Sequence, residues 1–342
     1  MSPVFKSAAI LIALAALVLA GLALFSAWQA ARIEARFPNK GELIDVGGLK
    51  LNSLMVEAGA DADLPPLVFI HGASGNLADP MGAFLDPLRG RAQMLFVDRP
   101  GHGYSERGGA DSVNPGGQAD AIARLMEKRG IAKAIIIGHS FGGAIAAALA
   151  LRHPERVAGL LFLSPATHPW PGGIDWYYDL ANVPVLGEVF CQTLATPAGL
   201  MRLEGGVKSV FSPNPVPAGY LDTAGIALVL RPKSFCNNAR DVANLLAWVK
   251  ENQPLYATIA APTVIVTGDS DDIVLEELHS RGLARDIKGA ELVWVHNLGH
   301  KPDYIATSLS IAAIEKIAGM PRDLATLARD LESRIAHDGD GR

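Results

Sequence analysis

Short apolar runs alternate with longer segments of helical spacing along most of the chain. Each of six such runs begins a segment that continues into a polar or glycine-containing loop: PPLVFIHG (65–72), QMLFVDRPGHGYS (93–105), AKAIIIGHS (132–140), VAGLLFLSP (157–165), APTVIVTGDSDD (261–272) and AELVWVHNLGH (290–300). Runs of this length are typical of strands buried on both faces. Helical spacing occurs around 80–88, 118–129, 141–153, 276–287 and 304–317. This alternation predicts an α/β fold, with a mostly parallel sheet covered by helices on both faces.

Three segments depart from this rhythm. Residues 42–57 form two alternating runs around Gly47-Gly48, which predicts a β-hairpin. Residues 166–257 are rich in proline and aromatic residues, so we expect an irregular block inserted after the strand that ends at Leu163. The tail 321–342 is charged and has helical spacing.

The N-terminal segment is predicted to cross a membrane. From Ala8 to Trp28 there are 21 residues without a charge, enough to span a bilayer as a helix. We therefore interpret residues 1–31 as a membrane anchor, followed by a polar linker over 30–40. A cleaved signal peptide is the alternative, but the run is long and lacks a clear cleavage site. Flanking basic residues are nearly balanced, and the large domain that follows favours an extracytoplasmic location.

Composition argues against some classes of partner and of binding site. The formal net charge is −5 and there is no basic tract, which argues against a nucleic-acid partner. The two cysteines, Cys191 and Cys236, form no CxxC or Cys/His cluster, so we expect no metal site. In an exported protein these two cysteines could pair, whereas in a cytosolic one they would stay reduced.

Polar groups collect in the loops that follow the predicted strands, where reactive groups of an open α/β sheet gather. Ser140 lies between Gly138 and Gly142, Asp271 and Asp272 follow the run that ends near 267, and His300 follows the last run. A serine hydroxyl is a poor nucleophile alone and needs a base. The order Ser, Asp, His therefore indicates nucleophilic catalysis.

These loops resemble those of the α/β-hydrolase superfamily. Gly138-x-Ser140-x-Gly142 matches the nucleophile elbow, and the resemblance covers about residues 40–318. It implies a hydrolase core over 32–165 and 258–320, with 166–257 as a cap or lid. It also implies Ser140 as nucleophile, His300 as base, and no cofactor. The first helical amides after Ser140 should favour negative charge.

The resemblance assigns the remaining catalytic groups. The family pattern Gly-x-x-Asp places the triad acid at Asp271, with Asp272 as the alternative. The backbone amides of Phe141 and Ala73 are the implied oxyanion hole.

Other histidines compete for the role of base. His296 lies in or at the end of the last strand run, and His139 is the variable position of the nucleophile elbow. His71 and His102 lie in loops that shape the pocket in the family. All four are expected to be non-catalytic.

The predicted function is hydrolysis of a carboxylic ester or related acyl bond of a small, apolar substrate, because Ser140 argues against reactions that use an aspartate nucleophile. Some of the cap's aromatic residues should line an acyl pocket, although each is more readily explained as cap core. The alternatives are a non-catalytic sensor on the same fold, a cofactor-free perhydrolase and a C–C bond hydrolase.

Overall fold

A single sheet dominates the computed structural model, which describes residues 3–339. Met1 and Ser2 of the predicted anchor, and Asp340, Gly341 and Arg342 of the predicted tail, lie outside the described residues. Within them the strands are β1 (Glu42–Asp45), β2 (Lys50–Val56), β3 (Leu67–Ile70), β4 (Met94–Val97), β5 (Ala134–His139), β6 (Val157–Leu163), β7 (Thr263–Gly268) and β8 (Glu291–Val295). Their order in the sheet is β1-β2-β4-β3-β5-β6-β7-β8. The pairs β1–β2 and β2–β4 are antiparallel, and the other pairs are parallel.

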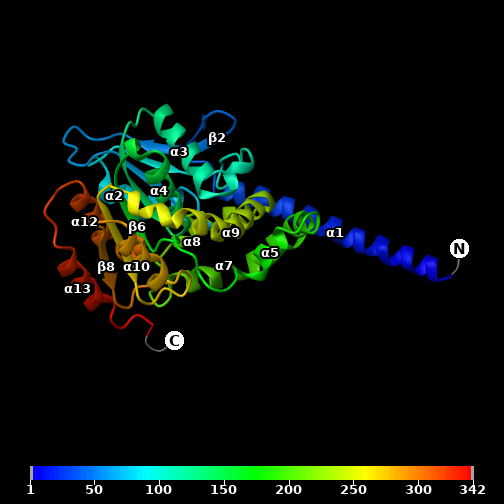
Figure 1. Cartoon of the computed structure of the whole chain (residues 1–342). Coiled ribbons are helices and arrows are strands. Elements are labelled where there is room, and N and C mark those ends of the chain that lie inside the picture. Colours follow the sequence, from blue (N-terminus) through cyan, green and yellow to red (C-terminus); the bar gives the residue numbers. More distant parts are fainter. Residues whose placement is uncertain (1–2, 340–342) are drawn as a thin grey trace.

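Helices cover both faces of this sheet, which confirms the predicted fold class (Figure 1). One apolar core packs under α3 (Pro115–Lys128), α4 (Phe141–Arg152) and α10 (Glu276–Asp286). The opposite core packs under α2 (Ala78–Leu88), α12 (Thr307–Ile317) and α13 (Leu324–Ile335). A short helix, α11 (Pro302–Ile305), precedes α12. Because the central strands are covered on both sides, their apolar runs are continuous, as the sequence predicted.

The inserted block 166–257 is helical rather than irregular. It contains α5 (Trp176–Ala181), α6 (Leu186–Phe190), a π-helical turn (Cys191–Ala195), α7 (Thr196–Phe211), α8 (Tyr220–Thr223) and α9 (Pro232–Asn252). The expectation was wrong because a proline does not always end a helix. Pro232 is the first residue of α9, where no N–H is needed, and Pro197 is the second residue of α7, just after the π-helical turn. Cys191 and Cys236 form a disulfide inside this block.

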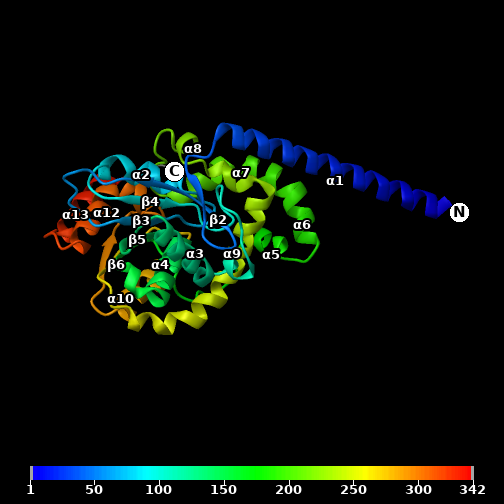
Figure 2. The ribbon, with the colours of Figure 1, turned by 90° about the horizontal axis from the view of Figure 1, so that it is seen from above.

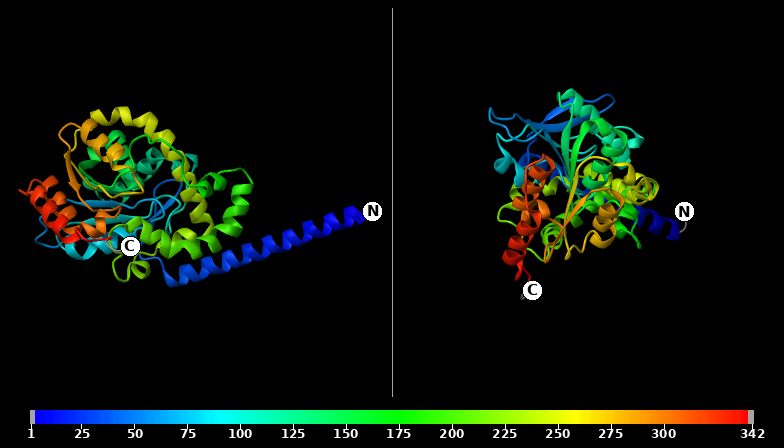
Figure 3. Two further views of the ribbon diagram at one scale, coloured as in Figure 1. Left: turned by 90° about the horizontal axis from the view of Figure 1, so that it is seen from below. Right: turned by 60° about the vertical axis from the view of Figure 1, so that its left-hand side comes forward.

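The two ends of the chain also differ from expectation. Helix α1 (Pro3–Arg36) continues through most of the predicted linker, because its polar residues are still good helix formers, and it stops before Pro38. It is long and apolar enough to cross a membrane, and its N-terminal part projects away from the body of the molecule (Figures 2 and 3). The charged tail forms α13, which buries Leu324, Ala328 and Leu331 on one face against the core.

Candidate active site

Ser140 lies at the turn between β5 and α4, at the carboxyl end of the central strands. Its backbone has φ 52° and ψ −119°, a conformation that is strained for a residue with a side chain. Two hydrogen bonds hold it there: Ser140 N–H donates to the carbonyl of Leu163 at 3.0 Å, and Ala166 N–H donates to the Ser140 carbonyl at 3.0 Å. The turn is therefore fixed by β6 and the residues after it, which leaves the side chain at the strand edge.

The two glycines around Ser140 are required by close packing. A Cβ atom on Gly138 would lie 2.5 Å from the carbonyl oxygen of Gly142. A Cβ atom on Gly142 would clash with the carbonyl of Ile70. Neither contact involves a flexible side chain that could move away, so residues larger than glycine would displace the backbone around Ser140.

Asp271 and His300 are in direct contact. His300 Nδ1 lies 2.7 Å from Asp271 Oδ2, and both side chains are buried. The other carboxylate oxygen of Asp271 accepts hydrogen bonds from the backbone N–H groups of Ile273 and Val274, each at 2.9 Å. Burial acts to raise the pKa of Asp271, but the attraction of His300 and these hydrogen bonds outweigh it, so the pKa lies below its usual value. Asp272 is exposed to solvent.

His139 joins the serine turn to the histidine loop. Its Nε2 atom lies 2.8 Å from the carbonyl oxygen of His300, and the two rings are 4.9 Å apart. Among the described residues, the hydroxyl of Ser140 makes no hydrogen bond, so a contact between Ser140 and His300 stays a prediction. Contacts between a nucleophile and its base are often long before substrate binds.

The loop after β3 lies against Ser140. A Cβ atom on Gly72 would be 3.0 Å from the Ser140 Cβ atom, and Ala73 follows directly. Phe141 is the first residue of α4, so its amide has no acceptor within the helix. The two predicted oxyanion donors thus belong to segments that flank Ser140 from two sides.

A cap residue, Asn238 on α9, holds the loop that contains Ala73. Its side-chain oxygen accepts a hydrogen bond from Ser74 N–H at 2.7 Å, and its amide donates to Ser74 Oγ at 3.2 Å. From the core side, Arg99 donates to the carbonyl of Gly72 at 3.2 Å. The loop is thereby held between cap and core.

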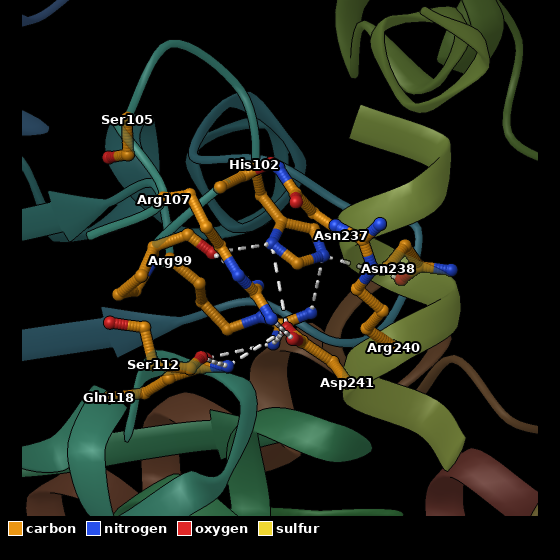
Figure 4. Close-up of polar contacts among 12 residues, drawn as sticks. Arg99, His102, Ser105, Arg107, Ser112, Gln118, Asn237, Asn238, Arg240 and Asp241 are labelled. Carbon is orange, nitrogen blue, oxygen red and sulfur yellow. Dashed lines mark hydrogen bonds and ion pairs between the residues drawn. The ribbon is translucent and has the colours of Figure 1, made fainter. Parts of the chain in front are cut away.

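Asp241 lies three residues after Asn238 on α9 and forms a buried ion-pair network with the core (Figure 4). Asp241 lies 3.1 Å from Arg99 and 2.6 Å from Arg107, and it accepts a hydrogen bond from Gln118 at 2.8 Å. The side chains of Arg99 and Asp241 are fully buried. The sequence reasoning missed Asn238 and Asp241. The available signal was two polar residues three positions apart, which lie on the same helical face.

A second buried charge cluster lies behind His300. The ammonium of Lys301 pairs with Asp79 at 2.9 Å and with Asp303 at 2.8 Å. Burial acts to lower the pKa of Lys301, but these two carboxylates raise it above its usual value. Asp79, His139 and Asp303 lie close enough to hold a metal ion, but the ammonium of Lys301 already pairs with both carboxylates. Local patterns carried no signal that Asp79 joins Lys301 and Asp303, because Asp79 lies 222 positions from Lys301 along the chain.

The competing histidines occupy different surroundings. Burial lowers the pKa of His71, His102 and His139 well below the usual value, so these rings are neutral at pH 7. His296 is exposed, and its Nδ1 atom lies 2.6 Å from Asp269. None of these four rings contacts Asp271.

An acyl pocket lined by cap aromatic residues stays a prediction. A cavity of about 100 Å³ lies between the end of α1 and neighbouring loops, and one of about 10 Å³ lies beside His139. Ser140 lines neither cavity. Phe190, Phe211 and Trp248 are buried in the cap, whereas the side chain of Trp176 is 65% exposed.

Comparison with known proteins identifies the family and the fold. Residues 65–302 match the profile of a protein family described as the alpha/beta hydrolase fold. The chain is 25% identical to Lipase 3 of Moraxella sp. (strain TA144) over 248 residues, which covers 69% of this chain and 72% of the lipase. It is 33% identical to the 2-hydroxymuconate semialdehyde hydrolase of Pseudomonas sp. (strain CF600) over 148 residues, 42% of this chain and 50% of that one.

Solved structures show the same fold. The enol-lactonase from Burkholderia xenovorans LB400 superposes with a TM-score of 0.65 at 19% identity, covering 82% of this chain and all of that one. Across the first three curated relatives, the chain spans from 32% to 72% of the relative's length. The activities of those whole proteins therefore do not transfer to this chain directly.

Proposed function

The chain belongs to the α/β-hydrolase family, and from that premise we propose that it is a serine hydrolase that cleaves a carboxylic ester through an acyl-enzyme intermediate. The observation that carries the proposal is the 2.7 Å contact between Asp271 and His300 near the strained turn of Ser140. A strained serine turn could be structural, but a buried carboxylate that orients a histidine at the same strand edge has a direct chemical use.

In the proposed reaction, Ser140 Oγ attacks the acyl carbon and His300 accepts the serine proton. Asp271 holds His300 at Nδ1 and stabilises the imidazolium that forms. The amides of Phe141 and Ala73 donate hydrogen bonds to the oxyanion. His300 then protonates the leaving alkoxide, and a water molecule attacks the acyl-enzyme with His300 again as base. Both half-reactions use the same groups, and neither step of this proposal calls on a metal ion.

We further propose that α1 is a retained membrane anchor and that the domain lies outside the cytoplasm. Two observations support this. Ser26 and Ile33 of α1 are buried against the cap, so α1 is packed as part of the folded protein. The disulfide between Cys191 and Cys236 fits an oxidising compartment. An ester substrate with apolar acyl chains fits such a location.

The proposal is tested on the full chain in detergent micelles, because α1 packs on the cap. A fluorophosphonate probe should label Ser140, and short p-nitrophenyl esters should be hydrolysed. Ser140→Ala should abolish labelling and lower turnover by orders of magnitude. Ser333→Ala, which changes an exposed serine on α13, is the matched control and should behave as the parent chain.

The other functions appear as distinct results of the same experiment. Absence of labelling, with ester turnover unchanged by Ser140→Ala, would contradict catalysis and leave the sensor function. Labelling at Ser140 without ester turnover would contradict the ester substrate. That result would favour perhydrolysis or C–C bond hydrolysis on the same triad.

A further inference from the structure

The cap exposes apolar side chains at its end. Val185 and Leu186, in the turn that starts α6, are 78% and 61% exposed. Trp176 at the start of α5 is 65% exposed, and Val183 and Val189 are about 40% exposed. We call these five residues the cap tip. Exposed apolar clusters of this kind indicate a surface that meets another apolar phase.

The cap tip lies at the end of the molecule toward which α1 extends. Figure 2 shows α5 and α6 on the side of the body from which α1 projects, with the N-terminal part of α1 continuing past them. α1 contacts the π-helical turn that follows α6, where Ser26 Oγ donates to the carbonyl of Thr193 at 3.1 Å. Leu22 and Ala23 of α1 are half-buried, and α1 packs against this turn.

This contact fixes the height of the cap relative to a membrane. The uncharged run of α1 extends from Ala8 to Trp28, and at about 1.5 Å per residue its length of about 31 Å matches the hydrocarbon thickness. Leu22 lies six residues inside that run, so the cap reaches about 9 Å below its end. Because the uncharged run is hardly longer than the hydrocarbon layer is thick, α1 cannot move along the membrane normal far enough to lift the cap out of the lipid.

The charge pattern indicates which lipid surface fits. Between residues 174 and 201 there is no lysine, arginine or histidine, whereas Asp175, Asp179 and Glu188 are present. One basic side chain from α9, Arg240, reaches this surface, and it lies 3.5 Å from Glu188. The surface is therefore not basic overall, and attraction to anionic headgroups is weak there. Insertion of apolar side chains between lipids is the interaction that remains.

We propose that the cap tip docks into the interface of the bilayer that α1 crosses, with Val185 and Leu186 below the headgroups of neutral lipids. The cap is then held at the membrane surface by two attachments, α1 and the cap tip. This proposal rests on α1 being a retained anchor and is independent of the catalytic assignment.

The test places a polarity-sensitive fluorophore at single cysteines in the full chain, reconstituted into phosphatidylcholine vesicles. Cys191 and Cys236 are paired, so an introduced thiol is the one that reacts. Val185→Cys reports on the cap tip. Leu14→Cys, in the exposed middle of α1, is the positive control for insertion. Ser333→Cys on α13, at the opposite end of the body, is the control for a solvent position (Figure 1).

The expected result is quenching by lipids that carry a nitroxide on the acyl chain at Leu14 and Val185, but not at Ser333. Iodide in solution should quench the fluorophore at Ser333 alone. In one contrary outcome, lipid nitroxides quench the Leu14 probe, but iodide quenches the Val185 probe as strongly as the Ser333 probe. That outcome would leave the anchor proposal intact and show that the docking proposal is wrong. Shielding of Val185 from both quenchers would mean that a second protein copy covers the tip. Loss of lipid quenching at Leu14 would overturn the anchor and the docking together.

Discussion

Asn238 of the cap helix α9 accepts a 2.7 Å hydrogen bond from the backbone N–H of Ser74, the residue after Ala73 in the loop beside Ser140. Ser74 has φ 58°, a strained conformation that persists because both cap and core hold the loop. Helix α9 therefore holds the backbone next to a proposed oxyanion donor.

Replacing Asn238 should affect the chemical step more than binding. In Asn238→Ala the loop loses both bonds to Ser74, so the Ala73 amide is less well placed, and we expect kcat to fall about 10- to 100-fold with a smaller change in KM. Steady-state kinetics with a p-nitrophenyl ester measures both constants. Asn244→Ala on the same helix removes an amide that bonds only to its own helix at Arg240, and it should leave kcat within a few-fold. Equal losses in the two variants would mean that Asn238 merely stabilises α9.

Asp271 and Asp272 are distinguished by their surroundings. Asp271→Asn removes the charge that orients His300, and kcat should fall about 10⁴-fold. Asp272 is exposed, so Asp272→Asn should change kcat by no more than a few-fold. Turnover of the purified variants, with melting temperatures as a check on folding, compares them. A larger loss in Asp272→Asn would show that the triad acid has been assigned to the wrong residue.

Asp241 should be important for stability. Asp241→Ala leaves the buried Arg99 guanidinium without its carboxylate, and loss of one partner of a buried pair costs about 3–5 kcal/mol in the free energy of unfolding. Denaturant titration in detergent, followed by tryptophan fluorescence, measures the change. Asp179→Ala, at an exposed site on α5, should stay within about 0.5 kcal/mol of the parent. A loss below about 1 kcal/mol for Asp241→Ala would mean that water replaces the carboxylate there.

His279 makes the start of the cap sensitive to acid. Its Nδ1 atom accepts hydrogen bonds from the backbone N–H groups of Thr167 and His168, at 3.0 and 2.9 Å, so it must be unprotonated. Burial lowers the pKa of His279 to about 4, below its unfolded value of about 6.5. Between these two values the unfolded chain binds more protons than the folded one, so stability falls as pH falls, by about 3 kcal/mol for this group.

The measurement is the free energy of unfolding from pH 7.5 to 4.5. His279→Gln keeps a hydrogen-bond acceptor but does not titrate, so the dependence on pH should weaken by about one proton. His296→Gln is the control. Asp269 raises the pKa of this exposed histidine, so the contribution of His296 to the free energy of unfolding changes with pH in the opposite direction. If His279→Gln leaves the slope unchanged, His279 does not control acid unfolding.

The sequence alone indicated the sheet, its helices and the turn at Ser140, because these follow from local patterns. A strand buried on both faces must be apolar throughout, and a tight strand-to-helix turn requires glycine at Gly138 and Gly142. Asp271 and His300 were candidates for the same reason, since each follows a strand in a mostly parallel sheet whose carboxyl ends share one edge.

Only the tertiary structure decided the contacts between segments distant along the chain. Asn238 meets Ser74 across 164 positions, and Lys301 meets Asp79 across 222. No local pattern encodes such pairs, because they form only when segments distant along the chain pack together. The depth of the cap along α1 is likewise set by the contact between Ser26 and Thr193, whose residues are 167 positions apart. Local chemistry thus determined the sheet and the serine turn, while long-range packing determined what supports that turn and where the cap contacts α1.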